Sequence, residues 1–393
     1  MKYYLFSLSL FMLFSACVYE PERFVEPDDP NRVVSKMDAS WGHLYTINEG
    51  YQICNPSVSQ DSVNYPASML WLNFGGFLKV RAPDSVYTVS DVEQHDRLTV
   101  SDTAGQVLWY LMIDTAKHDC QFQDPEWSTH PNYIVALRAY DVDGRSACEN
   151  LDYGLFAVRM SDKKKFWFYD KDISEFATPH LWVNQESVED SAKVESDSTV
   201  KGFFGTEDVR LVYVDKNDRI VFVDFSAGGN GKEKLLKKPS GLDSWMMDSP
   251  MISPDGKFVA YNMIQSSMTG WKSFVQELSD KSTPVEIEKT EGMISNPVQP
   301  HWYKADSHLY VVWTEFPQGK QFVNKENLFS ESVHERSAGR TAMREISIAE
   351  EGKSIKWVGK VVELAPIPLI GGRSPDGHFV ATGANNGYVL ELP

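Results

Sequence analysis

The sequence predicts an all-β fold, a six-bladed β-propeller built from four-stranded antiparallel blades. Three observations indicate it: a repeated proline-led strand start, tight Pro-Asp-Gly turns between β-favouring runs, and no long amphipathic helical pattern in the sequence. Repeated four-stranded units that are arranged radially form a propeller, whereas strands that alternate with helices would indicate a parallel sheet. The composition agrees, because the 393 residues are 42% apolar and include 11 Trp and 17 Tyr.

The clearest repeat unit begins at Pro250. Its turn, Ser253-Pro254-Asp255-Gly256, joins two runs of β-favouring residues. Proline presets φ for a turn, aspartate bonds its own backbone, and glycine supplies the positive φ that closes a hairpin. A second copy of this turn is Ser374-Pro375-Asp376-Gly377. Turn chemistry alone accounts for both copies, so we interpret them as structural rather than catalytic.

Further units begin at similar strand-leading residues. In chain order the starts are Pro66, Pro125, Pro179, Pro250, Pro300 and Gly371, at intervals of 59, 54, 71, 50 and 71 residues. Each interval suits one four-stranded blade with its loops, so six starts predict six blades. The last unit has room for about three strands. We therefore expect a segment within Trp41 to Tyr51 to supply the missing outer strand and close the ring.

Three segments carry the repeat most clearly. They read Pro-Met-Ile-Ser-Pro-Asp-Gly-Lys-Phe-Val-Ala-Tyr from Pro250, Pro-His-Trp-Tyr-Lys-Ala-Asp-Ser-His-Leu-Tyr from Pro300, and Ser-Pro-Asp-Gly-His-Phe-Val-Ala from Ser374. These segments resemble the repeats of TolB-type, WD40-like propellers, and the resemblance extends from about residue 60 to the end of the chain. It implies a six-bladed propeller, a fold that both envelope interaction proteins and enzymes use, so the fold does not decide the function.

The first residues form a targeting segment. Lys2 supplies a positive charge, and the apolar run from Tyr3 to Ala16 is too short to span a bilayer comfortably. The run ends in Leu13-Phe14-Ser15-Ala16-Cys17, which resembles the lipobox of bacterial lipoproteins, although Phe14 stands where that family has leucine. The resemblance implies cleavage before Cys17 and lipid attachment to Cys17. The alternative is an ordinary secretory signal in which Cys17 has no role.

The lipoprotein resemblance also implies a location and a domain plan. Val18 rather than aspartate follows Cys17, which by the sorting rule of enteric lipoproteins implies the outer membrane, on either face. Residues 1–16 are then the signal peptide, residues 17–38 an acidic, proline-containing tether, and residues 39–393 the propeller. The net charge of −17 disfavours nucleic acid as a partner, because its phosphates would be repelled.

Three cysteines remain after Cys17: Cys54, Cys120 and Cys148. In an oxidising envelope one pair can close and leave one thiol free. We favour Cys120 with Cys148 because they flank one predicted blade, while the other pairings stay open.

Histidines are the candidate ligand-binding residues. His180 and His301 follow the leading prolines of two blades, and His130 lies a few residues into a third. Innermost strands line the channel of a propeller, where three imidazoles and a carboxylate would suit zinc or manganese. Propeller lyases of pectin fragments use channel histidines, but the spacing here does not reproduce their pattern. The alternative is hydrogen-bonded strand-end histidines without a metal, and we expect no cofactor.

The sequence contains neither a Gly-x-Ser-x-Gly elbow nor a His-Glu-x-x-His motif. We therefore expect a membrane-anchored, non-enzymatic scaffold that binds another envelope protein or a glycan. The alternative is a carbohydrate-active or peptide-processing enzyme with its site at the channel mouth, and a third possibility is a purely structural surface lipoprotein. Two insertions that break the period, Asn184 to Val200 and Glu315 to Arg340, are candidate binding loops.

Overall fold

The computed structural model describes residues 43–46, 57–66, 68–72, 81–87, 95–102, 105–144, 148–187, 197–226, 231–265, 270–279, 281–293, 296–305, 307–315, 340–348, 355–365 and 388–391. It contains five four-stranded sheets, each with its strands in chain order, and a separate two-stranded pair. Every pairing is antiparallel within these sheets. The all-β fold of four-stranded antiparallel units is thereby confirmed.

The sheets are formed by β2 (Ser57–Val58), β3 (Met69–Leu72), β4 (Arg97–Ser101) and β5 (Val107–Met112); β6 (Asp119–Trp127), β7 (Tyr133–Asp141), β8 (Leu151–Arg159) and β9 (Lys165–Tyr169); β10 (His180–Val183), β11 (Val209–Val214), β12 (Ile220–Asp224) and β13 (Lys232–Leu235); β14 (Met246–Ile252), β15 (Phe258–Ile264), β16 (Trp271–Glu277) and β17 (Val285–Glu286); and β18 (Val298–Ala305), β19 (His308–Glu315), β20 (Arg340–Ile348) and β21 (Ile355–Ala365). β1 (His43–Thr46) pairs with β22 (Tyr388–Glu391). The described helical segments are η2 (Thr115–Lys117), η3 (Gln185–Ser187) and α2 (Val200–Phe204).

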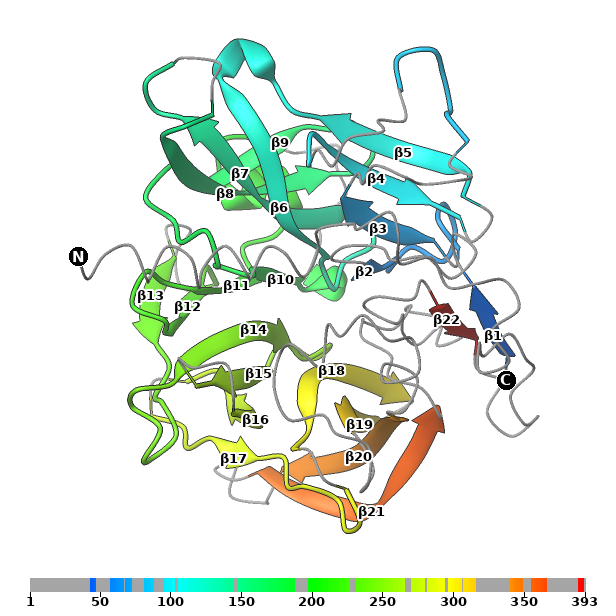
Figure 1. The fold of residues 1–393 in the computed structure, drawn as a ribbon, viewed down its shortest axis with the longest axis vertical. Coiled ribbons are helices and arrows are strands. Elements are labelled where there is room, and N and C mark those ends of the chain that lie inside the picture. The colour runs from blue at the N-terminus through cyan, green and yellow to red at the C-terminus, as the bar shows by residue number, and fades with distance from the viewer. Residues whose placement is uncertain are drawn as a thin grey trace.

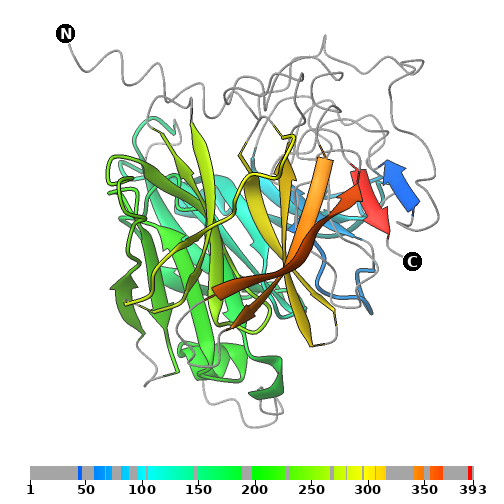
Figure 2. The ribbon, with the colours of Figure 1, turned by 90° about the horizontal axis from the view of Figure 1, so that it is seen from below.

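The five sheets lie around a common centre, with the β1–β22 pair between the last sheet and the first (Figure 1). The first strand of each sheet is innermost, because β2 contacts β6, β6 contacts β10, β10 contacts β14, and β14 contacts β18. Seen at right angles to that view, the strands of neighbouring sheets stand next to one another (Figure 2). Four-stranded sheets arranged radially with their first strands at the centre are the architecture of a β-propeller.

The turn between β14 and β15 shows why the Ser-Pro-Asp-Gly sequence forms a hairpin. The Ser253 hydroxyl donates to Asp255 Oδ1 at 2.6 Å and accepts the backbone N–H of Phe258 at 2.9 Å. Asp255 Oδ1 also accepts the N–H of Lys257 at 3.1 Å. Gly256 has a φ of 72°, which glycine adopts without the steric cost of a Cβ. Side-chain hydrogen bonds and one left-handed glycine therefore close this turn.

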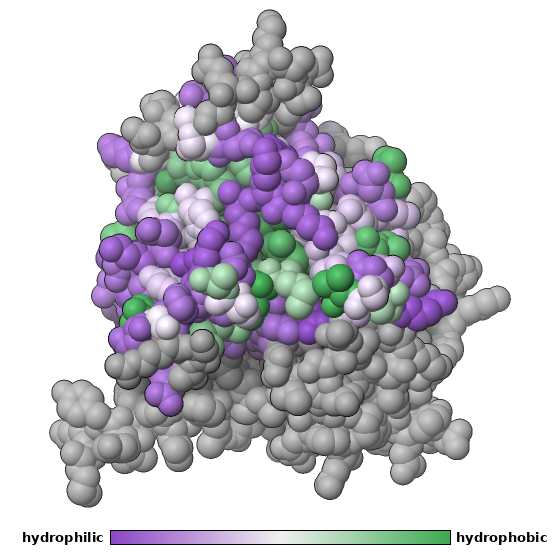
Figure 3. Space-filling view, turned by 90° about the horizontal axis from the view of Figure 1, so that it is seen from above, coloured by the Kyte–Doolittle hydropathy of each residue, from purple (hydrophilic) through white to green (hydrophobic). Residues whose placement is uncertain are grey.

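Apolar side chains fill the space between neighbouring sheets. One cluster joins the first and second sheets and includes Trp71 and Phe156, and another joins the second and third and includes Leu137 and Leu211. All seven residues of β15 are buried, since sheets cover both of its faces. Large exposed apolar residues are scattered, and the surface in Figure 3 is mostly hydrophilic with small separate apolar patches. Burial of each large apolar side chain stabilises the fold by about 1.5–3 kcal/mol.

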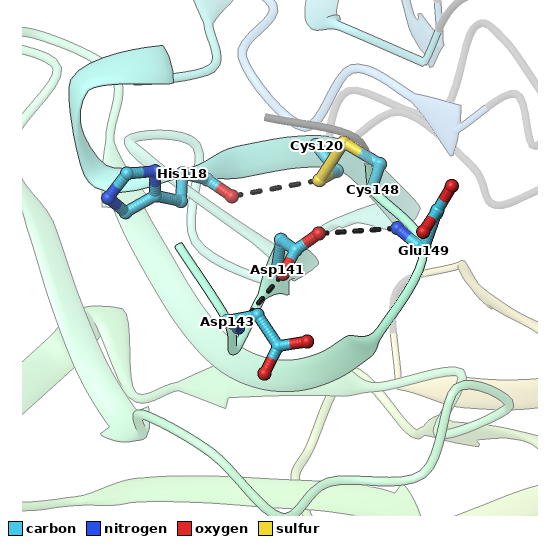
Figure 4. The surroundings of a disulfide bond; sticks show 6 residues. All are labelled: His118, Cys120, Asp141, Asp143, Cys148 and Glu149. Carbon is cyan, nitrogen blue, oxygen red and sulfur yellow. Dashed lines mark hydrogen bonds between the residues drawn. A yellow bond between two sulfur atoms is a disulfide. The ribbon is translucent and has the colours of Figure 1, made fainter. Parts of the chain in front are cut away.

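A disulfide joins Cys120 of β6 to Cys148, just before β8 (Figure 4). The chain between them turns at Asp141, whose carboxylate accepts the N–H groups of Asp143 at 2.9 Å and of Glu149 at 3.2 Å. The predicted disulfide between Cys120 and Cys148 is confirmed. Cys54 lies outside the described residues.

One unit start differs from the sequence prediction. Pro66 does not lead a blade, because it lies in the turn between β2 and β3, and the first sheet begins instead at Ser57, which follows Pro56. β2 is only two residues long, too short to leave a readable apolar pattern. Cys17, the second turn at residues 374–377 and the predicted signal peptide and tether also lie outside the described residues.

Candidate functional site

A backbone irregularity recurs at or just before four of the inner strands. The residue that precedes the leading proline has a positive φ in each case: 44° at Asp124, 37° at Thr178, 48° at Ser249 and 51° at Gln299. None of them is glycine, and left-handed backbone costs such residues about 1–2 kcal/mol. In three of these strands the pairing register shifts at the same place. Backbone strain recurs at the same position in four sheets. It indicates that the side chain after the proline must be held in a fixed orientation.

The bulge positions the residue that follows the proline. These post-proline residues are Ser57, Glu126, His180, Met251 and His301. Two of them accept a backbone N–H from the next sheet. His180 Nδ1 accepts from Ile252 at 3.1 Å, and Ser57 Oγ accepts from Trp127 at 2.9 Å. The post-proline side chains therefore tie neighbouring inner strands together.

His180 and His301 influence each other although the β14–β17 sheet lies between their own sheets in the ring. Burial lowers the pKa of His180 to about 3, and the nearby His301 adds to that shift. Burial likewise lowers the pKa of His301 to about 4. Two inner-strand side chains from sheets that are not neighbours come close only near the centre of the ring, so both lie there. Both imidazoles are neutral at pH 7.

The hydrogen bond from Ile252 fixes the tautomer of His180. Because Nδ1 accepts that N–H, the ring proton of the neutral imidazole sits on Nε2. A metal-bound histidine uses a lone pair on one nitrogen and donates from the other. His180 is therefore arranged as a hydrogen-bond donor through Nε2, not as a metal ligand. Both ring nitrogens of His301 are buried and have no hydrogen-bond partner within the described part of the chain.

His130 lies apart from this pair, in the turn between β6 and β7. Its ring packs against Tyr133 with centroids 4.9 Å apart, and its Nδ1 accepts the N–H of Asn132 at 3.1 Å. Burial lowers the pKa of His130 to about 4. Among the residues that the structure describes, no three His, Cys, Asp or Glu side chains are close enough to hold a metal ion. The structure thus brings two of the three predicted histidines together.

Glu126 is a titratable post-proline residue that the sequence analysis did not select. Its carboxyl group accepts a hydrogen bond from the Ser57 hydroxyl, across the contact between the first and second sheets. Burial raises the pKa of Glu126 to about 8. Its hydrogen bonds with the Ser57 hydroxyl and the Trp127 backbone lower the pKa and only partly offset the effect of burial. Its offset from Pro125 is the same as that of His180 from Pro179, and this offset is the signal that would have identified it.

The two insertions are described only in part. In the first, Asp197 forms an ion pair with Arg159 at 3.1 Å, so the end of this acidic loop is attached to β8. In the second, residues 316–339 lie outside the described ranges. No helix in the described parts of the chain is both long and apolar enough to cross a membrane.

The fold defines a β-propeller protein whose post-proline side chains include buried polar groups near the centre of the ring. A TolB protein from Agrobacterium tumefaciens is similar in fold over 89% of this chain and 97% of its own, at 13% identity and a TM-score of 0.41. A glucose dehydrogenase-type oxidoreductase from Thermus thermophilus is similar over 89% and 100%, at 10% identity and a TM-score of 0.45. The GH43 protein BlXynB from Bacillus licheniformis is similar over 89% and 60%, at 8% identity and a TM-score of 0.35.

No protein-family model matches the chain, and no curated protein is similar to it in sequence.

Proposed function

We propose that this protein is a lipid-anchored binding scaffold of the bacterial cell envelope whose propeller holds another envelope protein or a glycan. The observation that carries the proposal is the set of post-proline side chains, four of which follow a positive-φ residue and a proline at the inner strands. A rigid ring that presents fixed hydrogen-bonding groups at its centre suits recognition. Residues 1–16 would be removed, Cys17 would carry the lipid at the outer membrane, and residues 17–38 would be the tether.

The proposal includes a ring of six blades that the N-terminal segment closes. The pairing of β1 with β22 supports it, because residues from opposite ends of the sequence share one ladder, with Thr46 opposite Tyr388 and His43 opposite Glu391. In this arrangement the sixth blade takes strands from both ends of the chain. Removal of residues 39–56 from the soluble domain should then destabilise every blade, whereas removal of residues 17–38 should not. Equal melting temperatures for the two truncations would argue against closure.

His180 and His301 suit binding better than acid–base catalysis. A general acid or base works best when its pKa is near the working pH, and burial lowers the pKa of both His180 and His301 to about 3–4. Neutral imidazoles with one fixed donor instead suit hydrogen bonds to hydroxyl or carbonyl groups. A carbohydrate-active or peptide-processing enzyme is the second candidate, because the nitrogens of His301 have no described partner and a substrate would supply one.

Crosslinked pull-down from envelopes tests the scaffold, with the wild-type chain beside His180→Ala and His301→Ala. The proposal expects a partner that the wild type captures and both variants lose. Metal analysis of the same three proteins separates the second candidate, since stoichiometric metal in the wild type that both variants lack would contradict a binding-only role. The anchor is tested by labelling with an azido-palmitate analogue and Cys17→Ser as control, and an unlabelled wild type would exclude it.

A further inference from the structure

A second polar site lies away from the channel, at the rim of the third sheet. The turn between β11 and β12 and the segment after β13 line an open surface pocket of about 740 Å³ (Figure 1 shows these strands). Its lining includes Asn217, Arg219, Leu235, Lys237, Lys238 and Asp243. Pockets of this size accommodate small molecules.

The charge of the pocket is opposite to that of the protein. The chain carries a net charge of −17, yet three cationic side chains, Arg219, Lys237 and Lys238, line this pocket with one carboxylate, Asp243. At physiological salt, charges interact over roughly 8 Å, so the local cluster rather than the net charge acts on a bound group. The lining itself is therefore net positive on an acidic protein, while Asp215 lies beside Arg219 and Asp218 lies near Lys238.

The three cations are held differently. Lys238 Nζ donates to the carbonyl oxygens of Trp245 at 2.7 Å and of Asp243 at 3.2 Å, so it is fixed at the pocket wall. Arg219 forms an ion pair with Asp215, with 3.9 Å between Nε and Oδ2, but its buried Nε has no hydrogen-bond partner in the described structure. Lys237 is exposed, and no carboxylate of the described residues pairs with it. Lys237 therefore keeps its donors free for a ligand, and the partly exposed Arg219 guanidinium is held only by a long ion pair.

One wall of the pocket is apolar. Leu235 is 41% exposed there, one of few large apolar side chains on the described surface that are exposed to this degree. An anion with a hydrocarbon body would cover Leu235 while its charged group meets Arg219 and Lys237. We propose that this pocket binds a small organic anion, with a carboxylate or phosphate group on the cations and an apolar body on Leu235.

Isothermal titration calorimetry on the full chain tests this with phenyl phosphate, benzoate and phenol as probes. Phenyl phosphate or benzoate should bind and phenol should not, and the better of the two anions identifies the charged group that the site prefers. A charge-assisted hydrogen bond contributes about 1.5–3 kcal/mol. Arg219→Gln and Lys237→Gln should therefore each weaken binding about tenfold or more, and Leu235→Asn should weaken phenyl phosphate more than inorganic phosphate.

Lys257→Gln is the matched control, because Lys257 is exposed and does not line the pocket. Its affinity should equal that of the wild type. Lys237 is a surface side chain, so a folding defect would not explain a loss in Lys237→Gln. Binding of neither anion, or equal affinities in the wild type, Arg219→Gln and Lys237→Gln, would overturn the proposal. These measurements do not probe His180 or His301. Their outcome is therefore independent of the proposed scaffold function.

Discussion

A Cβ placed on Gly256 would lie 2.5 Å from Cε2 of Trp182, because the turn of the fourth sheet packs directly against an indole of the third. The same indole donates from Nε1 to the carbonyl oxygen of Pro254 at 3.0 Å. The guanidinium of Arg210 lies over the ring, 4.7 Å from its centroid. The Pro-Asp-Gly turn between β14 and β15 is therefore also a contact between blades.

Gly256→Ala should destabilise the protein by about 2–5 kcal/mol. A left-handed φ of 72° costs a residue with a Cβ about 1–2 kcal/mol, and overpacking against Trp182 adds about 1–3 kcal/mol. Denaturant unfolding measures the change. Gly241→Ala is the matched control, since Gly241 has a φ of 79° but no atom within 4 Å of the position that a Cβ would take. If both variants lose the same stability, the contact with Trp182 contributes nothing.

Loss of the Cys120–Cys148 bond should lower the free energy of unfolding by about 3–4 kcal/mol, since the bond closes a loop across 28 residues and restricts the unfolded chain. The double variant Cys120→Ser, Cys148→Ser should unfold at a lower denaturant midpoint than the oxidised wild type. Reductant should lower the midpoint of the wild type and leave that of the variant unchanged. A reductant effect of equal size in both proteins would contradict the assignment.

Much of the fold is visible in the sequence because its signals are local. Strand, turn and strand follow one another within about a dozen residues at Pro250, and this unit recurs along the chain. The predicted start of the first blade, Pro66, is wrong. The inner strand of that blade, Ser57–Val58, is too short to show an apolar pattern, whereas Pro66 precedes β-favouring residues as a strand-leading proline does.

The site could be predicted only as far as its candidate residues. His180 and His301 share one offset from a proline, which is visible in the sequence, and Glu126 shares it too. The tautomer of His180 cannot be predicted from the sequence, because its Nδ1 accepts a hydrogen bond from the N–H of a residue 72 positions away in the chain. Contacts between sheets decide which nitrogen carries the proton, and hence whether a metal can bind.

Replacement of the two channel histidines by leucine should have opposite effects on stability. His180→Leu leaves the buried N–H of Ile252 unpaired, which should cost about 1–3 kcal/mol. His301→Leu removes two nitrogens that have no partner in the described structure, so it should be neutral or stabilising. Thermal unfolding of the two variants measures both changes. A stabilised His301→Leu that no longer captures the partner would mark His301 as a binding residue, and equal destabilisation by both would contradict their different bonding.

Glu126 should make the protein less stable as the pH rises. Its pKa is about 8 in the folded state and about 4.3 in an unfolded chain, so the folded state holds the proton more tightly between these values. The stabilising contribution is complete below pH 4, and it is lost as the pH rises through the folded pKa, at about 1.4 kcal/mol for each pH unit between the two values. Glu126→Gln keeps the shape and cannot ionise.

The free energy of unfolding at pH 5, 7 and 9 therefore distinguishes the two proteins. The free energy of unfolding of Glu126→Gln relative to that of the wild type should increase from pH 5 to pH 9. Only the wild type must either bury a carboxylate or take up a proton when it folds, and both cost more as the pH rises. Ser57, which donates to this carboxyl group, can still donate to the glutamine oxygen, so a loss of that bond would not mask the trend. Glu286→Gln, at a partly exposed pair with Lys272, is the matched control for removal of one carboxylate. A constant difference for Glu126→Gln would mean that Glu126 is not buried as the structure has it.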